Sequence, residues 1–141
     1  MRYLKLITAV EVVVLLAVAS LITVTNANSD ESVQTAGGVS YVSGGVGADS
    51  IDRLRSIASD FNLKLVFATK SGDYVSGVGV AIAGAAGKTL LDTTSEGPWF
   101  LARLPAGSYQ VVATFGGKSV KRQITVGAAK LKTVDFRWDS E

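Results

Sequence analysis

The sequence of 141 residues contains neither cysteine nor histidine, and it has only two prolines. Without Cys and His the chain lacks the usual ligands of zinc, haem and iron–sulfur clusters, the thiol nucleophile and the commonest general base. We therefore expect no metal, no other cofactor and no enzymatic activity. Three pairs of side chains remain that could act in catalysis, but their positions have structural explanations. Asp49 and Asp52 lie at a helix start, Asp92 and Glu96 flank a turn, and Ser119 and Lys121 lie on a solvent-facing strand.

A strong charge of one sign is also missing. Fourteen Lys and Arg residues against 12 Asp and Glu residues leave a net charge of +2. The densest basic group is Lys118, Lys121 and Arg122, which on adjoining strand positions is more typical of a solvated face than of a phosphate-binding patch. Binding to nucleic acid is therefore not expected.

The long apolar run of this chain lies close to its N-terminus. Arg2 and Lys5 precede the segment Leu6–Val24, in which 15 of 19 residues are apolar. A short basic stretch followed by an apolar one is the pattern of a secretory signal peptide. Small residues at Thr25 and Ala27 favour cleavage after Ala27, and no cysteine follows that would carry a lipid anchor.

Alternatives to this cleavage remain open. Cleavage after Ala19 would leave an apolar stretch on the mature N-terminus. The 19-residue segment can also just span a bilayer as an uncleaved anchor, although Glu11 inside it would cost about 2.5–3.5 kcal/mol. A pilin-type leader would carry such a charge too, but its Gly-Phe processing site is absent. Every alternative exports the rest of the chain to the periplasm or the extracellular space, free or anchored in the membrane and facing the periplasm.

An exported chain without cysteine has no disulfide bond, so its fold must be held by its own core. Residues 28–48 form a polar, glycine-rich tether, within which Val39–Val42 is apolar enough for a brief edge strand. The sequence divides into four segments: a signal peptide or anchor (1–27), the tether with its short strand (28–48), a helix (49–62) and a β-sandwich (63–138).

The helix over 49–62 is indicated by one apolar stripe at the 3.6-residue period. Asp49 or Ser50 suits its N-cap, and Asn62 suits a left-handed closing position. Gly44 and Gly45 begin the Gly-Gly-Val-Gly element before it, which we interpret as a structural turn rather than a phosphate-binding loop, because no Gly-Lys-Ser/Thr ending follows. The stripe consists of Ile51, Leu54, Ile57, Ala58 and Phe61.

No further helical pattern follows the first helix. Alternating or short apolar runs, separated by Gly or Pro, predict seven strands at the spacing of a β-sandwich. The fold class is therefore mainly β, an immunoglobulin-like or transthyretin-like sandwich with one amphipathic helix packed at its N-terminal side. The predicted strands cover 63–69, 78–83, 88–94, 99–103, 108–115, 118–126 and 130–138.

The stretch Thr93–Val111 contains the element Leu-Pro-Ala-Gly-Ser-Tyr, in which Pro105 and Gly107 form a tight turn while Leu104 and Tyr109 return to the core. With the preceding Gly-Pro turn and aromatic strand, this stretch resembles carboxypeptidase regulatory-like domains, which have a transthyretin-like (prealbumin-like) sandwich fold. The resemblance implies that fold over about 63–126. The structural turn residues are Gly97, Pro98, Leu104, Pro105, Gly107 and Tyr109.

Three further stretches, Tyr41–Gly47, Phe61–Phe67 and Gly97-Pro98, are similar to a small exported proteobacterial group of this class. That group has no assigned activity. The resemblance therefore implies a compartment and a fold, but no chemistry.

The function expected is that of a non-enzymatic module that binds another envelope or extracellular protein through an edge strand or a loop. One alternative is a self-associating subunit of an extracellular assembly. Another is a carbohydrate-binding module that stacks sugars on Tyr74, Trp99, Phe100 and Trp138. Trp99, after Gly-Pro, is the best candidate for an exposed aromatic. The candidate interaction residues are Tyr41, Gly44, Gly45 and Trp99.

Overall fold

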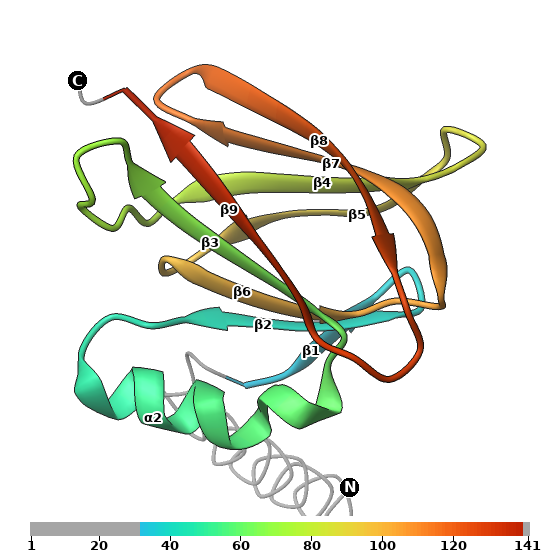
Figure 1. Cartoon of the computed structure of the whole chain (residues 1–141), viewed down its shortest axis with the longest axis horizontal. Coiled ribbons are helices and arrows are strands. Elements are labelled where there is room, and N and C mark those ends of the chain that lie inside the picture. The colour runs from blue at the N-terminus through green and yellow to red at the C-terminus, as the bar shows by residue number, and fades with distance from the viewer. Residues whose placement is uncertain (1–31, 140–141) are drawn as a thin grey trace, which may run out of the picture. The chain divides into compact units, whose positions relative to one another are not determined.

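The computed structural model describes residues 32–139, so the predicted signal peptide or anchor (1–27) lies outside the described residues. Nine strands form two sheets (Figure 1). The first sheet has the order β1 (Gln34–Ala36), β2 (Val39–Gly44), β6 (Trp99–Arg103), β3 (Leu63–Thr69) and β9 (Lys132–Trp138). The second has the order β5 (Thr89–Ser95), β4 (Val78–Gly84), β7 (Gly107–Phe115) and β8 (Lys118–Val126).

The predicted mainly-β architecture and all seven predicted strands are confirmed, with boundaries shifted by at most two residues. The tether prediction is wrong in two places. Residues 34–36 form β1, and β2 is not an edge strand but lies between β1 and β6. Val39 and Val42 are both buried, one on each face of the sheet, which explains why β2 occupies an interior position.

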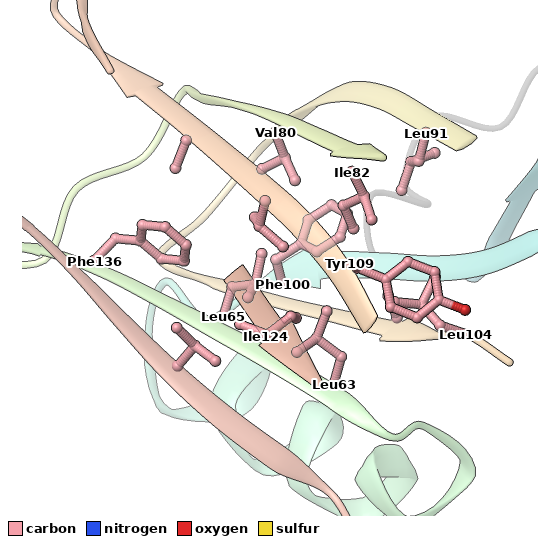
Figure 2. Packing of buried hydrophobic residues seen from close by; sticks show 14 of the residues in the cluster. Leu63, Leu65, Val80, Ile82, Leu91, Phe100, Leu104, Tyr109, Ile124 and Phe136 are labelled. Carbon is pink, nitrogen blue, oxygen red and sulfur yellow. The ribbon is translucent and has the colours of Figure 1, made fainter. Parts of the chain in front are cut away.

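The two sheets pack face to face around one apolar core. Figure 2 shows Val80 and Ile82 from the second sheet pointing toward Phe100 from the first, and Tyr109 lying beside Leu104. The alternation of buried and half-buried residues along β4 and β7 follows from the two-residue period of a strand. β3 and β9 are paired in parallel, whereas the other strand pairs are antiparallel.

The predicted amphipathic helix is α2 (Ala48–Ile57), continued by the 3-10 turn η1 (Ala58–Asp60). Its apolar stripe packs on the outer face of the first sheet, against Val42, Trp99 and Leu101. The N-cap prediction is wrong, because Gly47 occupies that position without a side-chain cap. Ser50, inside the helix, instead accepts a hydrogen bond from the Gly45 N–H at 2.7 Å, which ties the helix to the end of β2.

Asn62 is the buried polar residue that links three distant parts of the chain. Its amide nitrogen donates to the carbonyl oxygens of Leu104 at 2.7 Å and Gly127 at 2.9 Å, and its side-chain oxygen accepts from the Leu104 N–H at 2.9 Å. Its backbone N–H and C=O pair with Ala102 and Lys132. The left-handed conformation predicted for Asn62 is wrong, since positive φ occurs only at glycines in residues 32–139.

We predict that Asn62→Ala lowers the free energy of unfolding by about 2–5 kcal/mol, because two buried backbone groups of Leu104 and the half-buried carbonyl of Gly127 lose their hydrogen-bond partner. Urea unfolding followed by circular dichroism measures this loss. Gln123→Ala removes an exposed amide and serves as the control, with a change within about 0.5 kcal/mol. Equal stabilities of the two variants would contradict the role assigned to Asn62.

Candidate binding surfaces

Between β6 and β7 the chain bends at Ala106, and Gly107, which was predicted to form the turn with Pro105, is the first residue of β7. Leu104 and Tyr109 are buried in the core between the sheets, and the Tyr109 hydroxyl donates a hydrogen bond to the carbonyl oxygen of Pro105. A tyrosine that closes a loop through such a bond is a recurrent device of β-sandwiches. This turn is therefore a structural element of the fold.

The structure brings together Gly44, Gly45, Gly97, Pro98 and Trp99, but as a packed corner rather than an exposed contact site. A Cβ atom on Gly97 would lie 2.2 Å from the Gly44 carbonyl oxygen, and one on Gly45 would lie 3.2 Å from the Trp99 ring. The end of β2 and the turn before β6 thus approach as closely as two backbones can. The glycines at this corner are explained by packing.

Trp99 is only 8% exposed, so the expectation of an exposed aromatic at this position is wrong. Phe100 and Trp138 are also buried, whereas Tyr74 is 62% exposed on the loop between β3 and β4. These four side chains therefore do not form one sugar-stacking platform. Tyr41 is half-buried and stacks on Phe100, with ring centroids 5.6 Å apart.

We predict that Gly97→Ala lowers the free energy of unfolding by about 3 kcal/mol or more, because the new methyl group would overlap the backbone of Gly44. Gly127→Ala is the matched control, since a Cβ there meets nothing within 4 Å. Its stability should change by less than about 0.5 kcal/mol. Urea denaturation compares the two, and a mild effect at Gly97 would show that this corner can relax.

Two cations lie over the ring of the buried Trp99. The Lys64 ammonium is 3.5 Å from the ring centroid, and the Arg55 guanidinium carbon is 5.8 Å from it. Such contacts with an aromatic face are attractive. Burial lowers the pKa of Lys64 below its usual 10.5, the nearby Arg55 lowers it further, and Asp135 opposes them. This cluster joins the helix to the sheet and offers no free base in a cleft.

The lowered pKa of Lys64 predicts a pH dependence of stability. Between the folded-state pKa and 10.5, the unfolded chain binds more protons than the folded chain, so stability rises with pH through this window. The free energy of unfolding of the wild-type protein, minus that of Lys64→Met, should therefore increase as the pH is raised from neutral toward 10.5. Urea unfolding at several pH values measures the difference. In an Arg55→Gln background this increase with pH should be smaller. A difference in the free energy of unfolding that does not change with pH would contradict the prediction.

The pairs considered for catalysis lie on the surface. Asp49 and Asp52 are exposed on α2, and Asp92 is exposed on β5. The Ser119 hydroxyl lies 2.7 Å from the Thr114 hydroxyl, with which it shares a hydrogen bond on the exposed side of β7 and β8. Across residues 32–139, no group of three or more acidic side chains is placed to hold a metal ion.

A groove of about 440 Å³ lies between β8 and β9, the strands at the ends of their sheets (Figure 1). Each of these strands has a neighbour in its own sheet on one side only. At one end of the strands the Trp138 indole N–H donates to the Lys118 carbonyl oxygen, and Arg122 on β8 lies over the Phe136 ring at 5.7 Å. The groove is lined by Arg122, Gln123, Ile124, Lys132, Thr133, Val134 and Asp135.

Positive charge is concentrated in the part of the chain that contains both strands of this groove. Residues 32–115 carry six basic and six acidic side chains, whereas residues 116–139 carry six basic and two acidic ones. Three of these basic residues, Lys118, Lys121 and Arg122, form the group that the sequence pattern predicts to be a solvated face. Summing charge along the chain would have revealed the asymmetry, but not that β8 and β9 lie side by side. We call the groove and the two cations that line it, Arg122 and Lys132, the basic seam.

No protein-family model matches the chain, and no curated protein matches it. None of the helices within residues 32–139 is long and apolar enough to span a membrane.

Proposed function

We propose that the chain is an exported, non-enzymatic interaction module that binds an acidic, extended segment of another envelope or extracellular protein along the basic seam. The observation that carries this proposal is the groove between the edge strands β8 and β9, which Arg122 and Lys132 line in a part of the chain (116–139) with six basic and two acidic side chains. An edge strand presents unpaired N–H and C=O groups, which an extended peptide pairs with by adding one more strand.

The chemistry of the groove matches such a partner. Arg122 and Lys132 line it from opposite strands, so carboxylates of a bound segment would meet a cation on either side. Ile124 and Val134 form its apolar floor, since both are buried. Complementary charge sets the partner and the rate of encounter, while the main-chain bonds and the apolar floor hold the segment.

The resemblance to carboxypeptidase regulatory-like domains is part of the same proposal. It is supported by the two packed sheets and by the turn that Tyr109 closes through Pro105. The proposal that the chain is exported is supported by the basic residues and the apolar run near the N-terminus. An exported chain would meet other envelope or extracellular proteins.

A synthetic peptide that alternates glutamate and valine tests the binding surface. We expect it to perturb the NMR amide signals of β8 and β9 first, and to bind more weakly as salt is added, because the charges are solvent-exposed. A peptide that alternates lysine and valine should bind at least about tenfold more weakly. Perturbations centred on another part of the fold, or none at all, would refute the proposed site.

Charge-reversal variants separate the seam from the rest of the surface. Arg122→Glu with Lys132→Glu removes the two cations of the groove and should weaken binding of the acidic peptide by about tenfold or more. Lys70→Glu with Lys88→Glu changes the net charge equally at exposed positions outside the groove. Equal affinities of the two double variants would show that overall charge, rather than the seam, determines binding.

A further inference from the structure

The outer face of the second sheet has an unusual distribution of side-chain sizes. β4 is one of the two inner strands of this sheet, and it contributes only small, half-buried residues to the outer face, namely Gly79, Ala81 and Ala83. The neighbouring β7 contributes Gln110, Val112 and Thr114. The face therefore has a furrow along β4 and a ridge along β7. Within residues 32–139, α2 packs on the first sheet, so this face carries no helix.

Residues that are register partners on neighbouring strands form rows across this face. One such row has a negative charge at one end and a positive charge at the other. Asp92 on β5 is paired with Ala81, Ala81 with Val112, and Val112 with Lys121 on β8. Asp92 and Lys121 are both exposed. Three strand spacings separate them by about 14 Å, which is too far for a salt bridge within one molecule.

We propose that this face binds a second copy of the chain, related by a two-fold axis that runs parallel to the strands between β4 and β7. Such an axis exchanges the two sides of the row, so Asp92 of one copy faces Lys121 of the other twice per dimer. It also places the ridge of each copy in the furrow of the other, with Val112 opposite Ala81. Charge and shape are thus both self-complementary, as an isologous interface requires.

The pairs in the neighbouring rows fit the same axis. Gly79 is the register partner of Thr114, and Ala83 is the register partner of Gln110, so in each row a small residue on β4 would face a larger one of the second copy. A two-fold axis across the strands would instead set Asp92 against Asp92 and Lys121 against Lys121. The charges therefore favour the two-fold axis along the strands over the two-fold axis across them.

The size of the face indicates a weak dimer. Four strands about 4.8 Å apart and about seven residues long give a face of roughly 450 Å² per copy, and roughly 900 Å² in total. Areas of this size are typical of transient complexes rather than obligate ones. Dimerisation is therefore expected at high protein concentration, and added salt should weaken it.

Sedimentation equilibrium of the chain as recovered from its producing cells, up to about 1 mM, tests this proposal. Asp92→Lys sets two lysines against each other, and Lys121→Asp sets two aspartates against each other, so each variant alone should dimerise at least about tenfold more weakly than wild type. An equimolar mixture of the two variants restores both opposite-charge contacts and should dimerise as well as wild type does.

Asp52→Lys, which makes the same charge change on α2, is the matched control and should leave the dimer unchanged. Recovery in the mixture also shows that both variants are folded. A monomeric wild type at about 1 mM, insensitivity of the dimer to Asp92→Lys, or a mixture that stays monomeric would each overturn the proposal. None of these substitutions involves Arg122 or Lys132, so the outcome is separate from that of the peptide experiment.

Discussion

The amide of Asn62 is the interaction on which the arrangement of this fold depends. Its side chain bonds to the turn after β6 and to the connection before β9, while its own backbone begins β3. The chain has no cysteine, so no disulfide bond joins these segments. A buried amide with all its hydrogen bonds satisfied is a strict geometric constraint, because each bond left unmade would cost the full desolvation of a polar group.

This constraint determines where the last strand lies. Gly127 and Lys132, on either side of the β8–β9 connection, both bond to Asn62, so the chain leaves the second sheet and enters the first at a fixed point. β9 then runs parallel to β3 with β8 beside it. Arg122 of β8 and Lys132 of β9 thus line the same groove.

The two proposed surfaces complement each other physically. Lys and Arg along an open edge oppose pairing with an identical edge, because like charges would meet, yet they favour an acidic strand. Contact between identical copies therefore suits the face of the second sheet, where charges of both signs lie in one row. One edge recognises a different chain and one face recognises the same chain, so the two contacts do not compete for the same residues.

The sequence by itself determined seven of the nine strands, the apolar stripe of the helix and the burial of Leu104 and Tyr109, because each depends on periodicity or on residues only a few positions apart. Only the tertiary structure decided that β2 lies inside a sheet, that Trp99 is buried under Lys64 and Arg55, and that Asn62 is a structural link. The partners of Asn62 lie 42 and 65 residues away along the chain. A local pattern indicates which face of a strand or helix is apolar, but contacts over such separations exist only once the sheets have packed.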